Sequence, residues 1–338
     1  MGQEFHDELV PADTQGLPDG FFDRFVFNAH PSDKTAPSIL IGLGIYPPKD
    51  TVDGFVVLVT ETEQRNLRFS TELSATDGHG VGPFSWRMLE PNKTWQLTLA
   101  ANETGLGFDL TWHARTPAWF GEVGVNEGGT VTAAFDHLFQ SGYYEGSVTI
   151  DGVTCDAGGW YGQRDRSRGV RTMRGGQGLH IWYQAQFPDR SVGFLLVENR
   201  QGGRILLEGA VMHENGTLDD IVEVRHELNF NEDLDLVDGT VEVEAASGEK
   251  YLVHADASAR GGYMAGAGYG DHHGKPLGRD HLEHDVYPLD GSVTPRTVDS
   301  ALTDRLAFFD WNGVPGTGIF EFAHTRSSSY TYRPSLAR

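Results

Sequence analysis

A short stretch in the middle of the chain concentrates side chains that could do chemistry. Residues 158–171 read Gly-Gly-Trp-Tyr-Gly-Gln-Arg-Asp-Arg-Ser-Arg-Gly-Val-Arg, so that four arginines and one aspartate lie between glycines. An arginine fork, from Arg164 or Arg171, can hold the Asp165 carboxylate through two parallel hydrogen bonds. Asp165 could then supply or orient an acid in a cleft. The same residues could instead form a buried ion pair that only joins two parts of the protein.

The next segment predicts a strand with one unusual face. Within residues 179–187, alternation places His180, Trp182, Gln184 and Gln186 on one side. Ligand pockets combine aromatic surface with a few polar anchors, which this face offers; the alternative is an exposed face with one stray tryptophan. We expect His180 to carry protons. The expected substrate-binding residues are Trp160, Tyr161, Trp182, Tyr183, Gln184 and Glu321.

A histidine-rich segment at residues 271–285 raises the question of a metal site. His281 and Glu283 would share one face of a strand, and His272 could join them. The spacing matches no established ligand set, and the adjacent His272 and His273 would point to opposite sides of a strand. We therefore expect no metal and interpret His272 as a proton shuttle, because histidine titrates near neutral pH. A metal-dependent hydrolase built on His272, His281 and Glu283 is the alternative.

The sequence contains no motif for a serine nucleophile, a phosphate loop or a dinucleotide site. There is no Gly-x-Ser-x-Gly elbow and no phosphate loop ending in Gly-Lys-Ser/Thr. The glycine-rich run 266–270 does not open a helix after a parallel strand, as a dinucleotide site requires. We expect neither a nucleotide nor a flavin nor a haem.

Short strands must position these residues, because apolar and polar side chains alternate with a period of two. Leu106, Phe108, Leu110 and Trp112 share one face of such a run. Turn pairs such as Asp151-Gly152, Asp238-Gly239 and Asn312-Gly313 favour tight hairpins. One short helix face is expected from Val298, Leu302, Leu306 and Phe309. The pattern predicts an all-β protein built as an antiparallel barrel or sandwich. Further alternating runs occur at residues 38–46, 54–60, 68–73, 95–100, 146–150, 192–198, 204–212, 221–228, 240–245, 251–255 and 318–324.

Length and composition set the outer limits. The 338 residues suggest two modules, which we place at residues 1–174 and 175–338 because a glycine cluster lies at 174–178. With 48 acidic and 26 basic residues, the chain lacks the positive surface that nucleic acid or an anionic membrane would need. One cysteine, Cys155, excludes an intrachain disulfide. The acidic N-terminus lacks a signal-peptide pattern, so we expect a cytoplasmic protein, and a homodimer stays open.

The arginine-rich stretch also resembles the signature of a known family. Residues 162–171 resemble the Gly-x-Arg-Asp-His-Ser-Trp-Gly-x-Arg signature of tandem lipocalin-like proteins around carotenoid 1,2-hydratase (hydroxyneurosporene synthase). The flanks are similar too, with Val-Gly-Pro at 81–83 and Gly-Tyr-Gly-Asp-His at 268–272. Arg166 stands where histidine is usual and Arg168 where tryptophan is usual. If the family histidine donates a proton, His180 or His272 must do so here.

The resemblance implies two lipocalin-like β-modules with a cavity in or between them, and chemistry on apolar molecules without a metal or an organic cofactor. We therefore expect a cofactor-independent lyase, hydratase or isomerase acting on a hydrophobic terpenoid or aromatic molecule. Asp165, held by Arg164 or Arg171, would be the acid or its orienter, with His180 and His272 as shuttles. The alternative is a non-catalytic carrier or sensor of an apolar ligand, which would need no acid or base beside its cargo.

Overall fold

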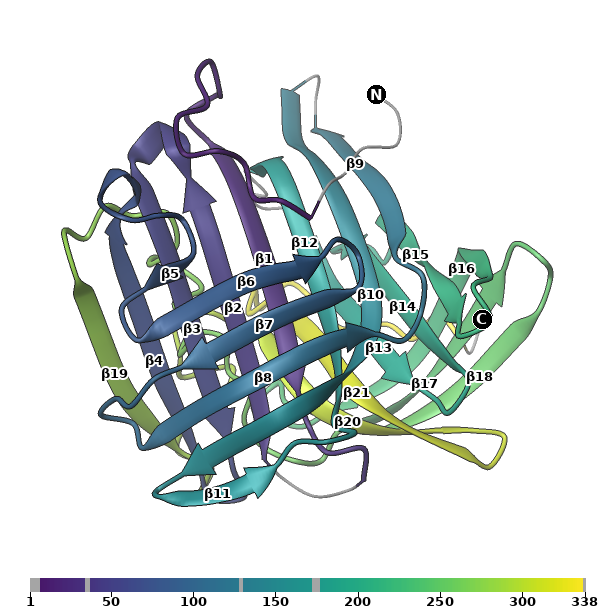
Figure 1. Cartoon of the computed structure of the whole chain (residues 1–338). Coiled ribbons are helices and arrows are strands. Elements are labelled where there is room, and N and C mark those ends of the chain that lie inside the picture. The colour runs from purple at the N-terminus through teal and green to yellow at the C-terminus, as the bar shows by residue number, and fades with distance from the viewer. Residues whose placement is uncertain (1–6, 34–36, 128–129, 172–176, 337–338) are drawn as a thin grey trace.

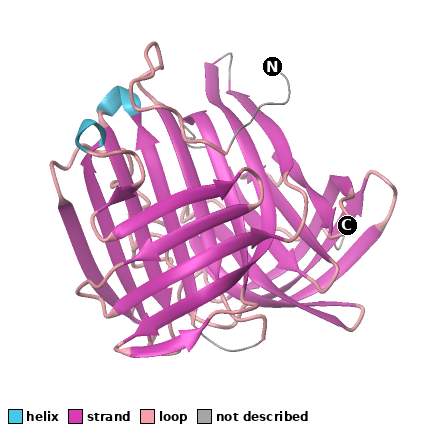
Figure 2. Ribbon diagram, viewed as in Figure 1, coloured by secondary structure: helices cyan, strands magenta, loops and turns pink. Residues whose placement is uncertain are grey.

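Nearly all of the chain folds into antiparallel strands, as the alternating pattern predicts. The computed structural model describes residues 7–33, 37–127, 130–171 and 177–336, without the side chains of residues 126–132. Figure 2 shows strands throughout, with two short 3-10 helices, η1 (Pro47–Lys49) and η2 (Leu73–Ala75). The described residues contain no helix long and apolar enough to span a bilayer. The all-β fold with two barrel-like parts is thus confirmed.

The first part is a large curled sheet with the strand order β19-β4-β3-β2-β1-β12-β10-β8-β7-β6-β5, and β9 and β11 also pair with β10. Strands β6, β7 and β8 cross over β1 to β4, so that the sheet encloses its own core (Figure 1). Phe25 and Trp95 meet there with ring centres 4.8 Å apart. The strands are β1 (Phe21–Ala29), β2 (Ser38–Tyr46), β3 (Thr51–Val59), β4 (Glu63–Glu72), β5 (Gly80–Val81), β6 (Phe84–Glu90), β7 (Thr94–Leu99), β8 (Leu106–Ala114), β9 (Trp119–Glu127), β10 (Thr130–Ile150), β11 (Val153–Asp156), β12 (Tyr161–Arg171) and β19 (His281–Pro288).

The second part is a closed eight-stranded barrel. Its interior is filled by side chains such as Tyr183, which stacks on Phe194 at 4.9 Å and contacts Phe320 at 5.0 Å. The opposite face of β13 carries Trp182, which belongs to an apolar cluster shared with the first sheet. The barrel strands are β13 (Gln177–Gln186), β14 (Arg190–Asn199), β15 (Arg204–His213), β16 (Leu218–Phe230), β17 (Leu236–Ala245), β18 (Lys250–Asp256), β20 (Thr303–Trp311) and β21 (Val314–His324).

Two local predictions are wrong. Leu306 and Phe309 lie on β20 and not on a helix, because the turn at Asn312 (φ 52°) and Gly313 (φ 83°) closes the β20–β21 hairpin. Asp238 and Gly239 lie inside β17, where they pair with β18 instead of forming a turn. The helix was predicted because apolar residues lie on both faces of β20, and their spacing resembles that of one helix face.

One strand from the second half of the sequence belongs to the sheet of the first half. Strand β19 comes from the second half of the sequence but pairs with β4 of the first sheet, for example Glu283 opposite Arg68. The glycine cluster proposed as the seam lies largely at residues 172–176, outside the described residues. The boundary at 174/175 therefore stays a prediction.

Buried ion pairs tie the first sheet to the segment that precedes it. Arg164 on β12 is fully buried and contacts Asp7 at 2.5 Å, and it also donates to Gln140 Oε1 at 2.8 Å. Arg166, two residues further along the same face, pairs with Asp23 of β1 at 2.8 Å and donates to the Glu8 carbonyl of the preceding segment at 2.8 Å. A buried charge is tolerated only when it is paired and hydrogen-bonded, so these arginines are structural.

We expect Arg164→Ala to lower the free energy of unfolding by about 3–5 kcal/mol, because it leaves the Asp7 carboxylate buried without its partner. Arg204→Ala is the matched control, since Arg204 is half-exposed and contacts Glu223 at 3.4 Å; its loss should stay below about 1 kcal/mol. Urea unfolding of both variants measures the difference. Equal losses in the two variants would contradict a structural role for Arg164.

Candidate active site

A cavity of about 390 Å³ lies between the curled sheet and the barrel. Strands β1, β10 and β12 line it from the first sheet, and β13, β14, β20 and β21 line it from the barrel. Its volume falls within the range of about 300–1,000 Å³ that small-molecule sites occupy. The cavity therefore has room for a small organic ligand, and titratable side chains line the walls that such a ligand would touch.

Alternation along β12 divides the arginine-rich stretch between two places. Asp165, Ser167 and Arg171 line the cavity, whereas Arg164 and Arg166 point into the first sheet. The expectation that Arg164 holds Asp165 is corrected, because consecutive strand residues face opposite sides. The Arg171 guanidinium instead lies over the ring of Phe135, 5.2 Å from its centre, while its charge acts on the cavity carboxylates.

His137 holds the Asp165 carboxylate. From β10, His137 donates through Nε2 to Asp165 Oδ2 at 2.6 Å and through Nδ1 to Glu208 Oε1, on β15, at 2.5 Å. Burial by itself lowers the pKa of His137, but the two carboxylates outweigh burial and raise it from 6.5 to about 9. This wall therefore carries an imidazolium between two carboxylates at neutral pH.

The barrel wall carries three more titratable groups, Asp304, Glu321 and His180. Asp304 on β20 pairs in register with Glu321 on β21, and the two carboxyls are hydrogen-bonded. Burial, together with the neighbouring carboxyl, raises the pKa of Asp304 well above its usual range, and burial raises the pKa of Glu321 to about 7. Two buried carboxyls this close cannot both ionise. The pair thus retains a proton at neutral pH.

His180 extends this network from β13. Its Nε2 lies 2.6 Å from Glu321 Oε1, close enough for an ion pair. Burial and the charge of Arg171, however, lower the pKa of His180 to about 4. Near pH 7 the contact is therefore a hydrogen bond of a neutral imidazole, along which a proton can pass between His180 and Glu321.

The other predicted site residues lie elsewhere. Of the four aromatic residues proposed as an apolar wall, Trp182 lines the cavity. Trp160 packs in the core of the first sheet, and Tyr161 lies under the Arg115 guanidinium at 4.8 Å. Tyr183 points into the barrel, as alternation with Trp182 requires.

Two polar predictions also fall outside this cavity. Gln184 is fully buried further along the face of Trp182 and does not line the cavity. His272 lines a second cavity, together with Arg68 and Glu283. The described structure therefore gives His272 no contact with Asp165.

Sequence reasoning missed His137, Glu208 and Asp304. His137 meets Asp165, and Glu208 meets His137, only because β10, β12 and β15 come together in the fold, and no local spacing marks that. A signal for Asp304 existed. A hairpin closed at Asn312-Gly313 places Asp304 opposite Glu321, but the helix predicted over this segment concealed the pairing.

A comparison with protein-family models gives one match. The model of a family of unknown function, DUF8625, matches residues 6–325. The chain belongs to the DUF8625 family. No curated protein matches the sequence of this DUF8625 member.

Solved structures resemble the DUF8625 chain in fold. A Nitrosomonas europaea protein provisionally named AttH superposes with a TM-score of 0.61 at 10% identity, covering 96% of this chain and 99% of its own. Kievitone hydratase from Nectria haematococca superposes with a TM-score of 0.50 at 12% identity, covering 94% and 93%. At these identities the likeness shows a shared fold.

The raised pKa of His137 predicts a pH-dependent contribution to stability. Its pKa is about 9 in the folded protein and 6.5 ordinarily. The contribution is therefore complete below about pH 6.5 and is lost as pH rises through about 9, and it amounts to about 3 kcal/mol. The gap in unfolding free energy between wild type and His137→Gln should narrow by this amount between about pH 6 and about pH 10. Urea unfolding at both pH values measures the gap.

The exposed Leu252 on β18 offers the control, because its side chain does not titrate. The gap between wild type and Leu252→Ala should not change with pH over the same interval. A gap for His137→Gln that stays constant with pH would show that the two carboxylates do not hold the imidazolium.

Proposed function

We propose that this DUF8625 protein is a lyase, hydratase or isomerase that moves protons on a hydrophobic terpenoid or aromatic molecule in the cavity between its two parts. The chemistry would be carried by side-chain acids and bases alone. One observation supports this most strongly: one wall retains a proton on Asp304 and Glu321, while the other presents the Asp165 carboxylate beside an imidazolium. Environments that push titratable groups apart in this way assign an acid and a base.

Glu321 and Asp304 are the proposed acid. A general acid works best with a pKa near the working pH, and burial raises the pKa of Glu321 to about 7. Asp304 holds a proton that can replace the one Glu321 gives up. His180, hydrogen-bonded to Glu321 at 2.6 Å, can return a proton to the pair.

Asp165 is the proposed base. It lines the cavity and accepts a hydrogen bond from His137 at 2.6 Å, which fixes the direction of its carboxylate. The His137 imidazolium is itself fixed on its far side by Glu208. Both nitrogens of the protonated His137 carry hydrogens, so the proton that Asp165 takes leaves through the cavity and not through His137.

The apolar lining supports a hydrophobic substrate. Val26, Leu195 and Leu302 line the cavity with Trp182 and Tyr269. Aromatic faces of this kind stabilise a positive charge that develops on carbon, and Arg171 can receive an oxygen of the substrate. Kievitone hydratase shares the fold, which makes hydration a natural member of the proposed reaction class.

The proposed steps balance with water as the only co-reactant. In hydration, Glu321 gives a proton to one carbon of a double bond, water forms a bond to the other carbon, and Asp165 takes the proton that this water loses. Elimination runs the same steps in reverse. In isomerisation no water adds, and Asp165 removes a proton from a different carbon. Each cycle leaves the protein with its starting number of protons.

The test uses labelled water. Wild-type protein is incubated with a panel of terpenoid alkenes, terpenoid alcohols and aromatic alkenes in water carrying deuterium or heavy oxygen, and mass spectrometry follows the label. We expect wild type to put deuterium into a panel member, and heavy oxygen too if it hydrates. Glu321→Gln, Asp304→Asn and Asp165→Asn should each lower incorporation by roughly 100- to 10,000-fold.

Glu227→Gln is the matched control, because Glu227 is exposed on β16, remote from the cavity lining. It should incorporate label as wild type does. A panel member that binds wild type but takes up neither label and loses no water would contradict the proposal and favour the carrier. Incorporation that survives in all three cavity variants, with their fold intact, would also contradict it.

A further inference from the structure

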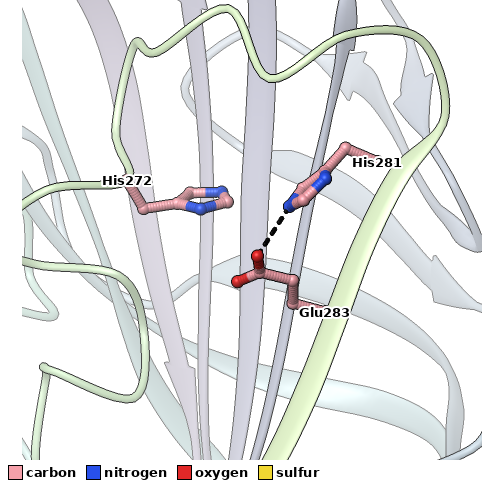
Figure 3. A group of neighbouring side chains, drawn as sticks. All are labelled: His272, His281 and Glu283. Atoms are coloured by element: carbon pink, nitrogen blue, oxygen red, sulfur yellow. Dashed lines mark ion pairs between the residues drawn. The ribbon is translucent and has the colours of Figure 1, made fainter.

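A second cavity, of about 500 Å³, lies where the loop 257–280 meets β19 and β4. His272 and Glu283 line it. Figure 3 shows these two residues and His281 with their side chains directed toward one another. One ligand atom from each lies within 4.8 Å of the others. The spacing of these three residues along the chain matches no established set of metal ligands.

The backbone holds the three residues together. His281 and Glu283 are two apart on β19 and so share a face. The loop brings His272 to them through a tight turn in which His272 N donates to the carbonyl of Gly268 at 3.0 Å. Gly268 has φ 91°, and a Cβ there would lie 2.6 Å from the Cβ of His272. The turn therefore needs glycine at position 268. The spacing rules for helices and strands do not apply to such a turn, so they could not predict that His272 meets His281 and Glu283.

The donor atoms suit a metal ion. His272 is 8% exposed, and its Nε2 is buried without a hydrogen-bond partner. His281 Nε2 lies 3.0 Å from Glu283 Oε1, while Arg68 Nε lies 3.4 Å from the other Glu283 oxygen. Arg68 thereby fixes the carboxylate and leaves Oε1 toward the two histidines. Its own charge is compensated by Asp285 at 3.0 Å.

We propose that His272, His281 and Glu283 bind one Zn²⁺ ion. Two imidazoles and one carboxylate form a donor set that zinc takes with a fourth position open, and the adjoining cavity can supply water there. Donors of one zinc ion lie within about 4 Å of one another, so small side-chain rotations complete the site. The ion would tie the loop 257–280 to β19.

Calorimetric titration with Zn²⁺ tests this on the full-length, tag-free protein after chelator treatment. We expect one equivalent to bind wild type, and at least a tenfold loss of affinity in His272→Ala, His281→Ala and Glu283→Gln. His284→Ala is the matched control: His284 lies on the same strand but pairs with Glu103 at 2.7 Å. It should bind zinc as wild type does.

Two further readouts separate a built site from scattered histidine binding. Zn²⁺ should raise the unfolding temperature of wild type and His284→Ala but not of His272→Ala, because only an intact site favours the folded state. Co²⁺ should show the visible absorption of a tetrahedral ion in the same two proteins. If His272→Ala fails to fold, zinc binding by His281→Ala and Glu283→Gln tests the site instead, because these two side chains are less buried. Absence of one-equivalent binding, or variants that bind as wild type, would overturn the proposal.

Discussion

Asp304 and Glu321 lie opposite each other on neighbouring strands and are buried together, so they cannot both carry a charge. That constraint gives the cavity its chemical character. The hairpin β20–β21 fixes the two carboxyls in register. A proton is therefore retained at a wall where a substrate would lie.

The facing wall also buries two carboxyl groups, but there a histidine lies between them. There His137 is protonated because it lies hydrogen-bonded between the buried carboxyl groups of Asp165 and Glu208. The cost of burying charge thus leaves a proton on the barrel wall and a protonated histidine on the wall of the curled sheet. The two walls belong to different sheets, so the two kinds of site face each other only where the curled sheet meets the barrel.

Much of the fold could be predicted from the sequence, because strand alternation and turn chemistry are local. Residues 38–46 match β2 at both ends, and 204–212 match β15 to within one residue. Alternation also assigned Trp182 and Tyr183 to opposite faces, as the structure has them. The same rule, applied to β12, would have separated Arg164 from Asp165.

The site could be predicted only in part. Asp165, Arg171 and Glu321 were singled out by residue type and do line the cavity. Their true partners come from pairing between distant strands, which no spacing encodes: His137 reaches Asp165 across β10 and β12, and Glu208 reaches His137 from β15. The turn at Gly268 that brings His272 to His281 is equally invisible to a rule based on regular elements.

The chemistry of the cavity depends on the Asp304–Glu321 pair keeping a proton at neutral pH. Carbon-13 NMR of carboxyl-labelled protein, with Glu321→Gln and Asp304→Asn used to assign the two signals, measures this directly. We predict that Glu321 titrates near pH 7 and that Asp304 still holds its proton there. Two carboxyls that both ionise at the ordinary values of aspartate and glutamate would contradict the account.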